Sequence, residues 1–309
     1  MCTDDESQTK PCRNASVNGE GSGGDVGRVT KILGASLLCL PVPALAEPSA
    51  SGLTGLGEMR TPDVVSNNET HVTLAPGRYT KMDGNDFVDH RVEPSIGVTQ
   101  GFGKRFEAGL RVPLLVQESS SELANASISA KLKIHDWPAF HVAADAGVEL
   151  PTASGKDHGS GQPGATAGVL ASATPWRTLV LAASVSYGTS DYCGRCTLPG
   201  SQGTEPGMLP VVRGAAGASF GAERLSVFGE VHALKVNNGN TTDGEFRGDP
   251  DLYALAGARV RLPMRLSLTA YGGVGLDAEG SNTEAVGSVL LHYRFSGFGA
   301  KPASSSAQP

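Results

Sequence analysis

Two short stretches of the chain carry residue types that could do chemistry. Cys193-Gly-Arg-Cys196 has the CxxC spacing of a redox centre, of half a metal site, or of a small loop disulfide. Asp157-His158-Gly-Ser160 brings an acid, a base and a nucleophile together. A serine nucleophile must lie within hydrogen-bond reach of a base that a third group orients. The elements that position these residues therefore decide which chemistry is open to them.

The N-terminal region predicts an exported protein. A basic stretch, Arg28–Lys31, precedes an apolar run that ends at Ala46 and fits the cleavage site of a secretory signal peptide. We interpret residues 29–46 as this signal peptide, with translation starting at Val29. Residues 1–28 are polar and acidic, unlike a signal peptide, and are expected to be either non-native or a disordered leader.

Apolar and polar residues alternate through most of the remaining chain. Between residues 139 and 150, for example, apolar side chains alternate with His141, Asp145 and Glu149. Strict alternation over ten residues predicts a strand with one apolar and one polar face. The pattern occurs twelve times, at about residues 71–80, 92–102, 105–116, 124–134, 139–150, 164–174, 177–188, 209–221, 224–235, 251–261, 265–276 and 285–295.

The connections between these segments alternate in length. The short ones are Gly103-Lys104, the HDWP stretch at 135–138, Pro175-Trp176, Ala222-Glu223 and 262–264. The long ones are 81–91, 117–123, 151–163, 189–208, 236–250 and 277–284. A soluble β-sandwich would use shorter strands, and its loops would not separate by length so regularly. We therefore predict an all-β fold, an antiparallel transmembrane β-barrel of about 12 strands over residues 71–298, with its short turns in the periplasm.

The polar faces of the predicted strands are rich in ionisable residues. Arg or Lys facing lipid at mid-depth would cost ~2–4 kcal/mol, so these side chains must face inward. The predicted pore-lining residues are Glu107, Arg111, Lys131, Lys133, His141, Asp145, Glu149, Arg213, Glu230, His232, Arg259, Arg261, His292 and Arg294. Two interpretations stay open: a conducting polar pore, or a wall of mutual ion pairs around a narrow interior.

The two ends of the predicted barrel carry segments without strand periodicity. Residues 47–70 are rich in Gly, Pro and Asn. They are either a periplasmic lead-in or a segment folded into the lumen as a plug. Residues 299–309 form an Ala/Pro/Ser tail that is expected to be disordered.

Three stretches resemble motifs of a bacterial outer-membrane barrel family, that of the MetA pathway of phenol degradation, whose members are also described as transporters. They are GLTGLGEMRTPDVV (52–65), QGFGKRFEAGLRV (100–112) and AADAGVELPTASGKDHGSGQPGATAGVLAS (143–172). Gly101-Phe102 replaces the family's Gly-Leu, and Ala153-Ser154 stands where the family tends to have Gly-Asp. The resemblance covers nearly the whole exported chain and implies a barrel that passes hydrophobic or aromatic compounds.

This framework places both chemical motifs in long loops. Cys193 and Cys196 are the cysteines that remain after signal-peptide cleavage, in an oxidising compartment. Their loop lacks the βαβ context of a redox centre and the further ligands of a zinc site, so they are predicted to form a local disulfide. His158 and Ser160 lie in a Gly-rich loop, where catalysis is not expected.

The predicted function is a passive channel or transporter of the outer membrane, for uptake or efflux of small molecules. No enzyme activity, cofactor or metal is expected, and a net charge of −6 argues against nucleic-acid binding. The expected partners are outer-membrane lipid and lipopolysaccharide, the barrel-assembly machinery and a small-molecule solute. Two alternatives stay open: a barrel enzyme that modifies lipids, and a structural barrel that displays its loops.

Overall fold

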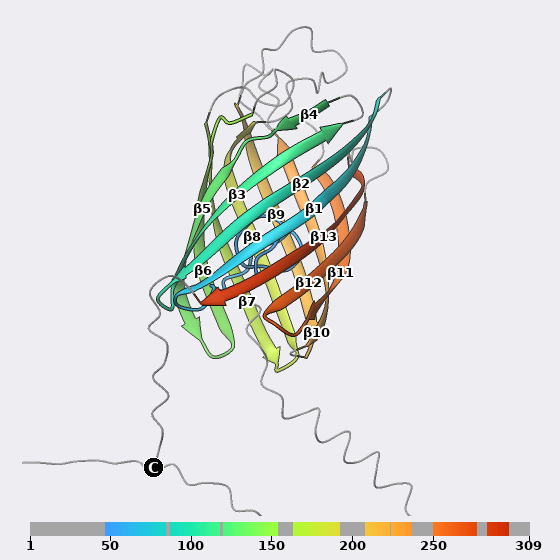
Figure 1. Ribbon diagram of the computed structural model, residues 1–309. Coiled ribbons are helices and arrows are strands. Elements are labelled where there is room, and N and C mark those ends of the chain that lie inside the picture. The colour runs from blue at the N-terminus through green and yellow to red at the C-terminus, as the bar shows by residue number, and fades with distance from the viewer. Residues whose placement is uncertain are drawn as a thin grey trace, which may run out of the picture. The chain divides into compact units, whose positions relative to one another are not determined.

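The protein folds as a closed antiparallel β-barrel (Figure 1). The computed structural model describes residues 47–84, 87–117, 120–153, 163–191, 208–222, 224–236, 250–276 and 283–296. The wall strands are β1 (Glu69–Gly84), β2 (Phe87–Phe102), β3 (Phe106–Gln117), β5 (Ser127–Trp137), β6 (Phe140–Glu149), β7 (Gly164–Trp176), β8 (Leu179–Asp191), β9 (Met208–Gly221), β10 (Leu225–Val236), β11 (Asp251–Arg261), β12 (Leu266–Gly275) and β13 (Thr283–Ser296). Each wall strand pairs with the next one along the chain, and β1 pairs with β13 from Glu69↔Ser296 to Met82↔Thr283, which closes the ring.

The predicted fold class is confirmed, with twelve wall strands in the expected order. Two predicted loops were wrong. Residues 81–91 continue β1 to Gly84 and resume as β2 at Phe87, and residues 117–123 contain β4 (Ser120–Leu123), which pairs only with β3. The Asp, Asn and Gly residues of 83–86 indicate a loop by composition. Backbone hydrogen bonds between the two strands of a hairpin do not depend on side-chain type. The pairing of β1 with β2 therefore continues through residues whose composition suggests a loop.

Within the part of the chain that the structure describes, no helix is long and apolar enough to cross a membrane.

The barrel is apolar outside and polar inside. On β5, Leu132 is 50% exposed on the outer surface, whereas its neighbour Lys131 is 1% exposed. The same contrast separates Leu268 from Thr269 on β12. Burying charge inside and exposing apolar side chains outside is the pattern expected where the outer surroundings are hydrocarbon.

A β-bulge in β1 changes which side chains face the interior. The pairing of β1 shifts register between Leu74 and Gly77 against β13, and between Ala75 and Arg78 against β2. Pro76 lies in this break, where its missing N–H costs no ladder hydrogen bond. Before the bulge the odd-numbered residues are buried inside, and after it the even-numbered ones are. The bulge therefore turns Arg78 toward the interior.

Candidate functional site

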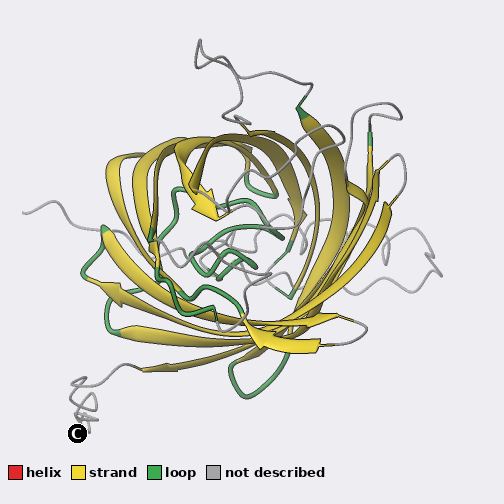
Figure 2. Cartoon of the chain, turned by 90° about the horizontal axis from the view of Figure 1, so that it is seen from above, coloured by secondary structure: helices red, strands yellow, loops and turns green. Residues whose placement is uncertain are grey.

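Residues 47–68, here called the inner segment, lie inside the ring of strands (Figure 2). The segment is looped on itself by hydrogen bonds from Ala50 N to Gly57 O at 2.8 Å and from Leu56 N to Met59 O at 3.0 Å. A Cβ at Gly55 would overlap the carbonyl of Met59, so this close loop requires glycine. The sequence left a periplasmic lead-in and a lumen plug open, and the structure places the segment against the inward side chains of the wall.

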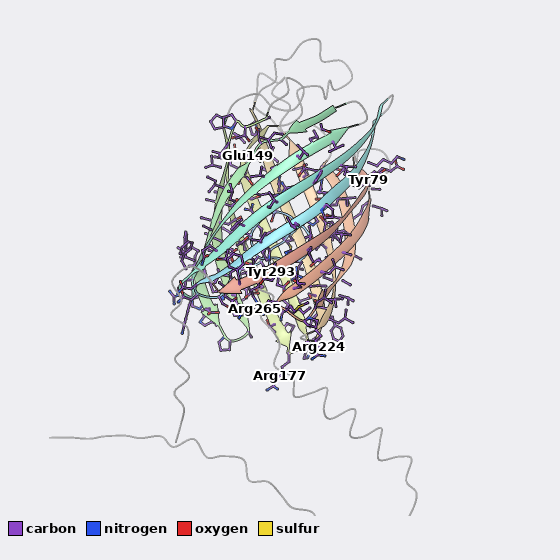
Figure 3. All side chains as sticks on the ribbon, in the orientation of Figure 1. Tyr79, Glu149, Arg177, Arg224, Arg265 and Tyr293 are labelled. Carbon is purple, nitrogen blue, oxygen red and sulfur yellow. The ribbon has the colours of Figure 1, made fainter. Side chains whose placement is uncertain are left out.

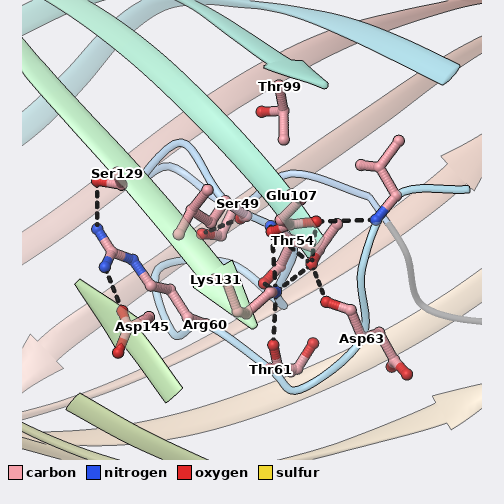
Figure 4. A network of polar contacts seen from close by, with 12 residues as sticks. Ser49, Thr54, Arg60, Thr61, Asp63, Thr99, Glu107, Ser129, Lys131 and Asp145 are labelled. Atoms are coloured by element: carbon pink, nitrogen blue, oxygen red, sulfur yellow. Dashed lines mark hydrogen bonds and ion pairs between the residues drawn. The ribbon is translucent and has the colours of Figure 1, made fainter. Parts of the chain in front are cut away.

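A buried ion pair between β3 and β5 holds the middle of the inner segment (Figure 4). Lys131 Nζ lies 2.9 Å from Glu107 Oε1, and both side chains are fully buried. Glu107 accepts hydrogen bonds from the backbone N–H of Thr54 at 2.9 Å and of Val65 at 2.8 Å. Lys131 donates to the carbonyl of Thr61 at 2.7 Å. The inner segment therefore completes the hydrogen bonding of both ions while it covers them, as a buried ion pair requires.

Glu230 on β10 binds three consecutive amides of the inner segment. Its carboxylate accepts from Gly57 N at 2.5 Å, Glu58 N at 3.1 Å and Met59 N at 3.0 Å. His232 Nε2 lies 2.7 Å from the same carboxylate. Successive amides that converge on one anion form the kind of backbone nest that binds anions elsewhere in proteins. Here the anion is part of the barrel wall.

Glu58 is held by four donors from three strands. Arg78 donates through Nε at 2.6 Å and a terminal nitrogen at 3.1 Å, a fork on one carboxylate. The hydroxyls of Tyr253 and Tyr271 donate to it at 2.9 and 3.1 Å. Burial by itself would raise the pKa of Glu58, but the charge and hydrogen bonds of Arg78, with His232 and Tyr253, together lower this pKa to about 2.

The start of the inner segment is fixed by a second carboxylate. Glu47 accepts from Arg261 Nε at 2.8 Å, lies 3.9 Å from Arg259 Nε, and accepts a short hydrogen bond from Ser267. Burial would raise the pKa of Glu47, but Arg259, Ser267 and Arg261 together lower it to about 2. Arg259 also donates to the carbonyl of Leu56 at 2.8 Å. Both acidic anchors of the segment therefore stay ionised at neutral pH.

Two further ion pairs join the segment to β5 and β6. Arg60 forms a short ion pair with Asp145, and Lys133 Nζ lies 3.8 Å from Asp63 Oδ1. The wall supplies the acid in one pair and the base in the other.

Two of the buried apolar side chains of the inner segment pack against apolar residues of the wall. Leu56 and Met59 pack in a cluster with wall residues of β1, β8 and β10–β13: Ala75, Val180, Ala182, Phe228, Leu255, Tyr271, Val286 and Leu290. A Cβ at Gly57 would approach Phe228 Cε2 to 2.7 Å, so the backbone of the segment lies directly on this ring. The interior thus has an apolar strip as well as the charged side chains that bind the inner segment.

The predicted pore-lining residues divide by their contacts. Glu107, Lys131, Lys133, Asp145, Glu230, Arg259 and Arg261 contact the inner segment, and His232 contacts Glu230. Arg111 pairs with Glu93, and His141 pairs with Asp136 at 2.5 Å. His292 is buried with its Nδ1 3.0 Å from Thr73 Oγ1, whereas Arg294 is half-buried near the end of β13. Glu149 lies toward the long-loop end of the barrel (Figure 3), and Arg213 lies in the half of β9 that is remote from its short turn.

Sequence reasoning missed the partners on the inner segment and one wall residue. Glu58 and Arg60 were not singled out, although they are isolated charges in a stretch of small residues. Arg78 was missed because the bulge reverses the parity of β1. The Pro76-Gly77 pair inside a strand pattern was the available signal for that bulge.

The motifs first considered for chemistry lie outside the described residues: Cys193, Cys196, Asp157, His158 and Ser160. Among the residues that are described, no group of three or more potential ligands could hold a metal ion. Serine faces histidine across two of the described strand pairs. Ser267 on β12 lies opposite His292, but its hydroxyl donates to Glu47. Ser172 on β7 lies opposite His141, which contacts Asp136. However, Ser172 Oγ is buried and makes no hydrogen bond, so it lacks both the base contact and the access that a nucleophile needs.

Comparison with solved structures identifies the same fold in outer-membrane proteins. The COG4313 outer membrane channel from Pseudomonas putida F1 matches with a TM-score of 0.56 and 9% identity, covering 76% of this chain and 98% of that chain. The KdgM porin matches at 0.47 with 10% identity, covering 72% and 99%. The TodX deltaS2S3 mutant monoaromatic hydrocarbon channel matches at 0.42 with 8% identity, covering 76% and 93%. The first match supports the fold alone, which is that of an outer-membrane β-barrel.

No curated protein matches the sequence. One family model matches residues 64–295, from the end of the inner segment to the last strand. This match covers most of the chain, so the protein belongs to the family described as "Putative MetA-pathway of phenol degradation".

Proposed function

We propose that the protein is a passive outer-membrane channel for small molecules and that the inner segment sets its conducting state. The observation that carries this proposal is the way the segment is held inside a closed barrel. Glu230, Glu107 and Arg259 bind its backbone N–H and C=O groups, which water can also satisfy. A segment held this way can exchange its wall contacts for water without unfolding the barrel that surrounds it.

Release of the segment would expose a lumen suited to weakly polar solutes. Phe228, Tyr271 and Leu255 would lose their cover of Leu56 and Met59 and form an apolar strip on the wall. Beside this strip stand hydroxyl and carboxylate groups able to orient one polar substituent. Pockets that are mostly apolar with a few placed polar groups favour small organic ligands. We therefore expect aromatic or hydrophobic compounds with one or two polar groups as solutes, in accord with the family's description.

The proposal includes no catalytic step. Serine lies opposite histidine in two described strand pairs, and neither serine offers a lipid-modifying enzyme a usable nucleophile. The buried hydroxyl of Ser172 has no hydrogen-bond partner among the described residues, and that of Ser267 donates to Glu47. A purely structural barrel would have no need of a separate segment fixed in its interior by four sets of ion pairs. We also propose that the long-loop end contacts lipopolysaccharide and that the barrel-assembly machinery folds the protein into the membrane.

Planar-bilayer recording tests the proposal directly. The full protein is compared with a variant that lacks residues 47–66 and retains Asn67, which accepts a hydrogen bond from Gly103 N at 2.7 Å in the first short turn. We expect rare or small current steps from the full protein and larger, persistent steps from the deletion variant. Folding of both proteins is checked by heat-modifiable gel mobility. An absence of current steps from the folded deletion variant would refute the channel.

Solute class is tested in liposomes that contain the folded deletion variant. Swelling rates are compared for a phenol-like solute and for a sugar of similar size. Faster entry of the aromatic solute, relative to liposomes without protein, is expected from the apolar strip. Equal rates would leave the channel in place but remove the preference for aromatic compounds.

A further inference from the structure

Most of the outward-facing aromatic side chains lie near the short turns of the barrel, whereas Tyr79 (Figure 3) and Tyr187 lie toward the long-loop end. The most exposed of those near the short turns are Trp176, Phe220 and Trp137, at 68%, 58% and 55%. Pairs of rings pack together there, with Phe102–Phe106 centroids 5.7 Å apart and Trp137–Phe140 centroids 5.8 Å apart. Such belts lie at the level of lipid headgroups. The turns, one to three residues beyond the belt, therefore reach the layer that contains the phosphates.

Four of the five short turns carry exposed basic side chains. They form what we call the basic rim: Lys104, Arg105, Arg177, Arg224 and Arg265. Figure 3 shows Arg177, Arg224 and Arg265 at one end of the barrel, with Glu149 and Tyr79 toward the other. The fifth turn, between Trp137 and Phe140, has no charged residue. The rim thus follows the circumference rather than one side of the barrel.

The described part of the chain supplies no counter-charge to the basic rim. None of its five side chains forms an ion pair or a hydrogen bond with another residue that the structure describes. Of the acidic residues in or beside the five turns, Asp136 pairs with Lys133 and His141, and Glu223 lies outside the described residues. Unlike the interior, where Arg78, Arg259 and Arg261 each meet a carboxylate, the rim presents its cations outward.

We propose that the basic rim is a docking surface for the phosphate headgroups of anionic glycerophospholipids in the membrane leaflet at the short-turn end. Charge complementarity and position both favour this partner. Each Lys or Arg near an anionic leaflet attracts it electrostatically, and the guanidinium fork of Arg matches the geometry of a phosphate. The aromatic belt sets the depth of the barrel, so that the rim meets phosphates rather than acyl chains.

This docking fixes the orientation of the barrel as well as its depth. Barrels of this kind keep their short turns in the periplasm, where the leaflet is built of phospholipid. The rim would then prefer phosphatidylglycerol or cardiolipin over zwitterionic phosphatidylethanolamine. The preference is electrostatic and is therefore weakened by salt, because the screening length falls to about 3 Å at 1 M ionic strength.

The two tryptophans of the chain provide a built-in probe of this surface. Both lie in the aromatic belt, and Trp176 precedes Arg177 directly. The Trp137→Phe protein, reconstituted in phosphatidylethanolamine vesicles, leaves Trp176 as the single reporter. Phosphatidylglycerol or phosphatidylethanolamine, each brominated near the headgroup, is then added at the same mole fraction, and quenching of tryptophan fluorescence gives the relative occupancy of the adjacent lipid sites.

Brominated phosphatidylglycerol is expected to occupy the sites near Trp176 about fivefold more strongly than brominated phosphatidylethanolamine, from the attraction of one nearby basic residue. Neutralising the five rim residues to Gln should bring the ratio close to one. Arg213→Gln, which removes a basic residue at the long-loop end, should leave the ratio unchanged. Equal quenching by the two lipids in the protein with an intact rim overturns the proposal, as does an unchanged ratio in the neutralised variant.

A second measurement covers the case in which the neutralised variant does not fold. The intact rim is studied alone, with sodium chloride raised from low concentration to 0.5 M. The preference for phosphatidylglycerol should fall steadily as salt rises. A preference that does not respond to salt would mean that shape or hydrogen bonding of the headgroup, rather than the charge of the rim, selects the lipid, and would contradict the proposal.

Discussion

Replacing Glu230 by Gln tests whether the nest of three amides is what keeps the inner segment in place. The substitution preserves the size of the side chain and removes its charge. One amide oxygen remains to accept hydrogen bonds, while the new NH2 group faces backbone N–H donors that have lost their acceptor. The bonds at stake run from the amides of Gly57, Glu58 and Met59, at 2.5, 3.1 and 3.0 Å.

Hydrogen bonds to a charged group contribute about 1.5–3 kcal/mol each, and neighbouring bonds do not add fully. Losing the charge and reversing one or two of these contacts should weaken docking by about 2–4 kcal/mol. Since about 1.4 kcal/mol is a factor of ten, the ratio of docked to undocked segment should fall by roughly 30- to 1,000-fold.

Single-channel recording measures this ratio as the fraction of time spent at the larger conductance level. The Glu230→Gln protein should spend far more time at that level than the unmodified protein does. Glu149→Gln is the matched control, because it removes an inward-facing carboxylate at the long-loop end of β6 (Figure 3). If the folded Glu230→Gln protein has the open fraction of the unmodified protein, the nest does not hold the segment and the argument fails.

Two other predictions concern the contacts of the inner segment, and a third concerns the cysteines of the loop after β8. Glu47 and Glu58 each have a pKa lowered from 4.5 to about 2 in the docked state, so their contribution to docking is complete above pH 4.5 and is lost as pH falls toward 2. Conductance recorded from pH 8 to pH 5 should therefore be constant, and a rise near pH 6 would contradict this assignment. Gly57→Val should open the channel without unfolding the barrel, because the new side chain meets Phe228, and current steps compared with heat-modifiable mobility separate the two effects. Replacing Cys193 and Cys196 together by Ser should leave assembly intact, since a bridge over so short a loop constrains little of the unfolded chain; loss of the heat-modifiable band would show otherwise.

The barrel was predictable because its signal is local. A strand that separates lipid from a polar interior must alternate every second residue, and the cost of a misplaced charge enforces that pattern. The adjacent residues Lys131 and Leu132 follow this alternation, and in the structure their side chains lie on opposite faces of the strand. The inner face of most strands could be assigned in the same way, from parity alone.

Parity failed where the backbone departs from regular pairing. On β1 the bulge at Pro76 shifts the pairing register, so residues after it no longer follow the odd–even alternation of those before it. Arg78 therefore faces the interior. The extension of β1 and β2 through residues 81–84 and 87–91 was missed for a related reason. Hairpin pairing is made by backbone groups, so it can continue through side chains that suggest a loop.

The sequence alone determined a closed antiparallel barrel with charge on its inner face, because the period of a strand and the cost of charge in lipid act on each segment separately. It left open what those inner charges contact. The inner segment has no periodicity, and its partners are distant in the chain: Glu47 meets Ser267, 220 residues later, and Gly57 meets Glu230, 173 residues later. Contacts of this kind arise only when closure of the barrel brings the inner faces of many strands around one stretch of chain. Only the tertiary structure therefore showed that many of the inward-facing charged residues bind the inner segment.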